Sequence, residues 1–215
     1  MARRVKTKRF ILRLLIFCAG LVVLSLGIDL NTKTQLGISP INSVPFNVHK
    51  LTGLPLWVCV YALYLVFILM QWLLLKKDFH PVQFLQIATS FVCSILIQFF
   101  DDRLPLLTTP VSQYLVLVLA IVLTAIGSAV TAGMHLTPNP GEGAAVAIGA
   151  ALKKDFALGK NVLDLGCVVL SVAITLIFAG KIMNIGIGTL ASMLFTGRVV
   201  KLFSGPTAKL YEKVS

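Results

Sequence analysis

Charged residues are scarce in this chain: they make up 13% of its 215 residues, while 57% are hydrophobic. A soluble domain carries about a quarter charged residues. A soluble fold of this size could not bury so much apolar surface, whereas a lipid bilayer removes the need to bury it. The composition therefore predicts an integral membrane protein of the all-α class.

Acidic residues are fewer still, with 8 Asp and Glu against 19 Lys and Arg. The resulting net charge of +11 could indicate nucleic-acid binding. However, the basic residues stand in short clusters between long uncharged runs, not on one face of a water-exposed domain. We therefore expect no nucleic-acid partner.

The chain also lacks the motifs of metal sites and catalytic centres. Its cysteines, each inside an apolar run and none in a CxxC pair, are Cys18, Cys59, Cys93 and Cys167. No histidine has a partner at metal-ligand spacing, and no Ser/His/Asp grouping, HExxH motif or paired carboxylate occurs. We expect no catalytic residues, no metal and no cofactor, and therefore no enzyme.

Long uncharged runs dominate what is present. A helix needs roughly 20 apolar residues to cross the hydrocarbon core of a bilayer. The last of the six candidate runs is the weakest, because Arg198 and Lys201 shorten it; both side chains could snorkel to the interface. The first follows a basic start but is long and has no typical cleavage site, so we expect a retained helix and not a signal peptide. The six runs cover residues 12–30, 54–75, 82–100, 111–134, 161–180 and 182–203.

The distribution of basic residues predicts the orientation of these spans. With six crossings, 15 Lys and Arg fall on the side of the N-terminus and 4 on the other side. Basic residues are enriched in cytoplasmic loops. We therefore expect both termini in the cytoplasm.

The chain contains a weak internal repeat. Three spans per half is an odd number, so the second half would enter the membrane in the opposite orientation, as in many secondary transporters. We expect a single transmembrane domain over residues 1–215, built from two inverted three-helix repeats at about 10–103 and 110–205. Shifted by 100 residues, the halves match at Gly27 and Gly127, Leu36 and Leu136, and Pro40 and Pro140.

A Pro/Gly-marked segment follows the first span of each half. These segments, about 31–54 and 135–160, are long and too apolar for ordinary solvated loops. Proline is favoured in the first helical turn, so each segment predicts a short helix. Such a helix either dips into the membrane and presents its N-terminal N–H groups to a cavity, or lies on the membrane surface with a structural role. Both possibilities stay open at this stage.

Acidic residues at membrane depth are the strongest candidates for function, because a charge there is costly and usually faces protein or water. Asp164 lies four residues after Lys160, so it either forms an interfacial ion pair or contacts a ligand or proton. Glu142 either binds substrate or merely favours a helix N-terminus, and for Asp29 an interfacial position is the simpler interpretation. The residues expected to bind substrate are Ser39, Asn42, Asn139, Glu142, Lys160 and Asp164.

Three stretches carry a resemblance to a known family: LGISPINSVPF at 36–46, GKNVLDLGCVVLSV at 159–172 and KIMNIGIGTLASMLFTGRVVKLF at 181–203. Together they resemble the YczE/YyaS/YitT-type bacterial membrane proteins, over residues 10–205. The resemblance implies a multi-pass protein of the bacterial plasma membrane. Some relatives are described as transporters or exporters.

The leading hypothesis is a small-molecule secondary transporter or exporter with its site at the interface of the two repeats. One alternative is a substrate-capturing membrane subunit that needs an energising partner. Another is a non-transporting accessory or regulatory membrane protein. The expected partners are the lipid bilayer and a small-molecule substrate, with a second copy of the chain or an energising subunit as further candidates.

Overall fold

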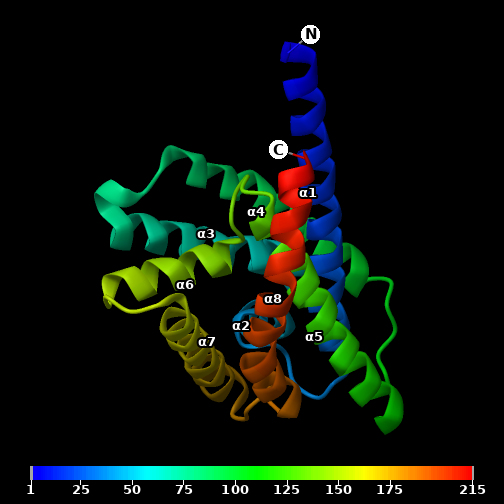
Figure 1. The fold of residues 1–215 in the computed structure, drawn as a ribbon. Coiled ribbons are helices and arrows are strands. Elements are labelled where there is room, and N and C mark those ends of the chain that lie inside the picture. Colours follow the sequence, from blue (N-terminus) through cyan, green and yellow to red (C-terminus); the bar gives the residue numbers. More distant parts are fainter. Residues whose placement is uncertain (1, 215) are drawn as a thin grey trace.

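The structure is a computed structural model that describes residues 2–214, with the side chains of residues 8–214. The regular secondary structure of the described part is entirely helical (Figure 1), and this part contains no strand. Two short 3-10 helices, Lys76–Asp78 and Pro81–Phe84, precede α4. The α-helices are α1 (Ala2–Lys33), α2 (Pro40–Thr52), α3 (Leu56–Leu75), α4 (Leu85–Asp101), α5 (Pro110–Gly133), α6 (Pro140–Ala151), α7 (Phe156–Ala179) and α8 (Ile187–Val214).

Five of these helices are long and apolar enough to cross a membrane: α1, α3, α4, α5 and α7. They coincide with the first five expected runs. Their outer faces carry large apolar side chains that are well exposed, among them Leu115, Val118, Ile177 and Phe178. Exposed apolar surface on this scale suits contact with lipid and not with water. The chain is therefore a multi-pass membrane protein.

The sixth expected span, 182–203, differs from the prediction. Its residues from Ile187 onward form the start of α8, which is not among the described helices that meet the length and composition of a membrane span. The reason is charge: Arg198 and Lys201 interrupt its apolar run, and the helix continues into a polar end. The expectation of six spans is thus supported for five.

The helices α1 and α5 run side by side and cross in close contact (Figure 1). Glycine makes this possible on both sides of the crossing. A Cβ added to Gly27 would lie 2.4 Å from the backbone nitrogen of Thr124, and one added to Gly127 would lie 2.4 Å from the backbone nitrogen of Leu24. Small residues let membrane helices approach until their backbones touch.

Both short helices expected in the Pro/Gly segments are present, as α2 and α6. Each begins with a proline, at Pro40 and Pro140. The side chain of Asn139 caps α6 by accepting a hydrogen bond from the Gly141 backbone N–H at 2.9 Å. Much of each helix is buried: α2 packs against α3 and α7, and so does α6. They therefore lie among the longer helices.

The loop that leads into α2 is held by the loop that leads into α8. The backbone N–H of Ile38 donates to the Asn184 carbonyl at 2.8 Å, and that of Gly188 donates to the Leu36 carbonyl at 2.7 Å. Gly37 has a φ of 113°, which favours glycine. A Cβ at this position would lie 2.5 Å from the backbone nitrogen of Gly186, in the loop that leads into α8. This contact fixes where α2 starts.

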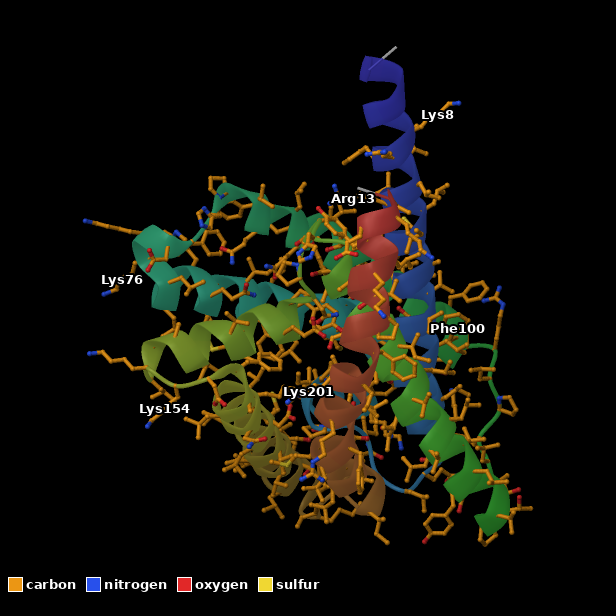
Figure 2. The ribbon with its side chains drawn as sticks, viewed as in Figure 1. Lys8, Arg13, Lys76, Phe100, Lys154 and Lys201 are labelled. Atoms are coloured by element: carbon orange, nitrogen blue, oxygen red, sulfur yellow. The ribbon has the colours of Figure 1, made fainter. Side chains whose placement is uncertain are left out.

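The start of α1 and the end of α8 lie at the same end of the molecule (Figure 1). Arg13 of α1 helps to join them: its guanidinium donates to the Met134 carbonyl at 2.7 Å and stacks 4.8 Å from the centre of the Tyr211 ring of α8. Figure 2 shows Lys8 beside the N-terminal end, with Lys76 and Lys154 pointing outward where α3 and α6 finish.

Candidate functional site

A cavity opens between the helices, with a volume of about 760 Å³ including its open mouth. Seven of the eight α-helices, all except α4, contribute to its walls. The cavity contains all six residues that the sequence singled out: Ser39, Asn42, Asn139, Glu142, Lys160 and Asp164.

The N-termini of the two short helices meet at this cavity. Ser39, Pro40 and Asn42 line it from the start of α2, and Asn139 and Glu142 line it from the start of α6. The closeness of these ends shows at Gly141, where an added Cβ would lie 2.9 Å from the Cδ1 atom of Ile41. Segments 100 residues apart therefore share one site, and each helix directs the positive end of its dipole toward it.

Asn42 is the most distinctive polar side chain of the cavity. It is only 6% exposed. Its Nδ2 atom donates to the Ser39 hydroxyl at 2.9 Å, but its Oδ1 atom is buried and accepts no hydrogen bond from the described residues. A buried acceptor without a partner is destabilising. The Asn42 Oδ1 atom is thus a buried acceptor that the described residues leave unpaired.

Lys160 and Asp164 form an ion pair across one turn of α7, between the lysine Nζ atom and the Oδ1 atom of the aspartate. The i,i+4 spacing predicted this pair. Asp164 is 1% exposed, so a partner is needed to compensate its charge. Because the ammonium already neutralises Asp164, this carboxylate is not the free charge of the cavity.

Glu142 differs from Asp164 because it makes no ion pair in the described part of the chain. It lies in the first turn of α6, outside the five candidate spans, and faces the cavity. Burial raises the pKa of the Glu142 carboxyl, while the Ser128 hydroxyl and the Lys160 ammonium lower it to a smaller extent. The Glu142 carboxyl therefore gains a proton more readily than that of an exposed glutamate.

Sequence reasoning missed several residues of the cavity wall. Ser128 and Thr124 are four residues apart on α5, and Ser192 and Thr196 are four apart on α8. Hydroxyl side chains at this spacing share one face of a helix, which was the available signal. Tyr64 and the apolar part of the wall carried no such signal. That apolar part is formed by Leu24, Ile28, Ile41, Phe156 and Val200.

Further polar clusters lie outside the cavity. Asp29, fully buried in α1, lies close to the ion pair in which Lys33 donates to Asp101 at 2.7 Å. Gln71 and Gln86 exchange two hydrogen bonds of 3.0 Å between α3 and α4. Nowhere in the described residues do three or more His, Cys, Asp or Glu side chains gather as metal ligands would.

Comparisons with known proteins add one finding. No curated protein and no solved structure matches the chain. A family model matches residues 11–205, which is nearly the stretch over which the resemblance to bacterial membrane proteins was expected. The protein is an apolar chain of many helices, and over most of its length it belongs to the family of unknown function DUF6198.

Proposed function

We propose that the protein is a small-molecule secondary transporter or exporter of a bacterial plasma membrane, with its substrate site in the central cavity. One observation carries the proposal. Residues from both halves of the chain, including the N-termini of two half-length helices, converge on one cavity between the helices. In transporters, substrate sites lie near the middle of the membrane, where discontinuous helices present their ends.

Two inverted repeats are part of this proposal. In support, α2 packs against α7 as α6 packs against α3, and the α1–α5 crossing uses Gly27 and Gly127 in equivalent ways. Gln35 and His135, also 100 residues apart, both have left-handed backbone conformations, with φ of 58° and 50°. The interface of the repeats is then the cavity itself.

The proposal includes a sixth crossing by α8 and short helices that dip into the membrane. In support, α8 packs along α5 and lines the cavity with Ser192 and Thr196. Helix ends within a bilayer are tolerated where they are enclosed by protein or line a cavity, as the ends of α2 and α6 are here. With six crossings, both termini face the cytoplasm, as the 15 to 4 distribution of Lys and Arg favours.

Filling the cavity tests the proposal. Gly197 lines it, and a Cβ at this position would meet no atom within 4 Å. Gly166, on the exposed face of α7, is equally open and serves as the matched control. Purified Gly197→Leu and Gly166→Leu proteins would be screened for thermal stabilisation by amines, carboxylates, amino acids and sugars.

The expected result is that a compound stabilises the wild type and Gly166→Leu but not Gly197→Leu. The same compound should move across the membrane of proteoliposomes that contain the wild type or Gly166→Leu, and not of those with Gly197→Leu. Binding and movement that survive in Gly197→Leu would place the site elsewhere. Failure of every compound class to bind or move would contradict the transporter proposal.

A further inference from the structure

The charges that line the cavity do not cancel. Its ionisable side chains are Glu142 from α6, Lys160 and Asp164 from α7, and Tyr64 from α3. The lining residues of α1, α2, α5 and α8 carry no ionisable group. With Tyr64 neutral and Lys160 paired to Asp164, an ionised Glu142 leaves a formal charge of −1. An uncompensated charge away from bulk water is costly, so this site favours either a proton or a cation.

Two hydrogen-bond acceptors of the cavity favour a ligand that donates hydrogen bonds. Asn42 Oδ1 is a buried acceptor with no partner, and the Glu142 carboxylate is a second acceptor in the same cavity. An ammonium group carries several N–H donors and a positive charge, so it could satisfy both. The Nδ2 atom of Asn42 already donates a hydrogen bond to the Ser39 hydroxyl. The Oδ1 acceptor is therefore the atom of the Asn42 side chain that lacks a partner.

The rest of the wall is apolar. Leu24 and Ile28 of α1, Ile41 of α2, Phe156 of α7 and Val200 of α8 make up much of the lining. A small inorganic cation would leave these surfaces without a partner. A cation with an apolar body would bury them, which favours binding because apolar surface is removed from water.

The positive dipole ends of α2 and α6, in contrast, disfavour a bound cation. Each helix N-terminus is equivalent to roughly half a positive charge. At α6, however, Asn139 occupies the Gly141 N–H, and Glu142 stands in the first turn of its own helix. The carboxylate thus lies where it offsets that dipole, and the orphan acceptor of Asn42 lies beside the other one.

From this arrangement we infer that the cavity binds an organic monocation, a primary ammonium with an apolar body, at Glu142 and Asn42 in exchange for a proton on Glu142. The inference rests on the proposed function and specifies its substrate class. When the ammonium binds, the Glu142 carboxyl releases its proton to solvent, so charge is conserved within the site. Asp164 stays paired to Lys160 throughout.

The test uses three probes of similar size and different charge: 2-phenylethylammonium, 2-phenylethanol and 3-phenylpropionate. Binding to the purified full chain would be measured by calorimetry and thermal unfolding between about pH 5 and pH 8. The ammonium alone should bind, and its affinity should fall toward low pH, where Glu142 is increasingly protonated and binding releases up to one proton. The sodium ion, added as sodium chloride, serves as the inorganic cation for comparison.

The variants Glu142→Gln and Asp78→Asn each remove one carboxylate and form a matched pair. Glu142→Gln should weaken ammonium binding by about tenfold or more and abolish proton release. Asp78→Asn removes an exposed carboxylate that does not line the cavity and should change neither. Should Glu142→Gln fail to fold, Glu142→Asp keeps the charge on a shorter side chain and should bind more weakly while still releasing a proton. Asn42→Ala should also bind the ammonium more weakly.

Several outcomes would overturn the inference: undiminished ammonium binding in Glu142→Gln, tighter binding of 3-phenylpropionate, equal binding of 2-phenylethanol, or stabilisation by sodium alone. Loss of proton release in Glu142→Asp would do the same. If 3-phenylpropionate binds and moves across the membrane, the transporter proposal stands and only the substrate class is wrong. If no probe or other compound binds, both fail.

Discussion

The crossing of α1 and α5 offers the sharpest test of the structure, through Gly127→Ala. At this position a Cβ would lie 2.4 Å from the backbone nitrogen of Leu24 and 2.5 Å from its Cα atom. Both atoms belong to the backbone of the facing helix, so no side chain can rotate away. The same change at Gly27 would place a Cβ 2.4 Å from the Thr124 nitrogen. In either variant the two helices must separate.

The magnitude follows from two opposing effects. Alanine stabilises a helix by about 1 kcal/mol relative to glycine. Overpacking a tight contact costs about 1–3 kcal/mol, and the upper part of this range applies where backbone must move. We therefore expect Gly127→Ala to lower the free energy of unfolding by about 1–2 kcal/mol in net terms, and Gly27→Ala by a similar amount. Because one separation relieves both contacts, the double variant should cost less than the sum of the singles.

The assay is equilibrium unfolding of the purified protein from detergent micelles, followed by helical circular dichroism. Gly166→Ala is the matched control, because a Cβ at Gly166 meets no atom within 4 Å and the residue also lies within a long helix. The control should be as stable as the wild type or up to about 1 kcal/mol more stable. If Gly127→Ala matched Gly166→Ala, the close crossing would be refuted. If only one of Gly27→Ala and Gly127→Ala were destabilising, the equivalence of the two halves would be refuted.

Three further predictions concern the polar clusters and the topology. Gln71→Leu should destabilise the fold by about 1–3 kcal/mol in unfolding experiments, because it leaves buried Gln86 without its partner; unchanged stability would contradict the pairing. Lys33→Met should lower the unfolding temperature more than Asp101→Asn does, because it leaves two neighbouring acidic groups, Asp29 and Asp101, without their shared cation; equal effects would count against this. A cysteine introduced at Lys77, in a background without native cysteines, should react with a membrane-impermeant maleimide only after cells are opened; labelling of intact cells would reverse the proposed orientation.

Much of the architecture could be predicted from local pattern. Uncharged runs of about 20 residues located five spans, since hydrophobic length is a property of the chain alone. Pro40 and Pro140 marked the starts of two short helices, because proline suits the first turn. The spacing of Lys160 and Asp164 predicted their ion pair.

The same reasoning was less successful for α8. Apolar residues over 182–203 suggested a span, but the charges of Arg198 and Lys201 fall inside a helix that continues to Val214. Whether such a helix crosses the bilayer depends on what its charged side chains meet in three dimensions. That information is not carried by hydropathy.

The candidate site shows the same division. The sequence by itself determined the membrane class, the positions of the short helices and the residue types with chemistry to offer, because composition and periodicity are local. Only the tertiary structure decided that Asn42 and Glu142 open onto one cavity, that Asn42 keeps an unpaired acceptor, and that Asp164 is neutralised while Glu142 is not. The physical reason is that burial and pairing depend on which helices pack together, here through the glycine contacts of α1 and α5 and the meeting of α2 with α6.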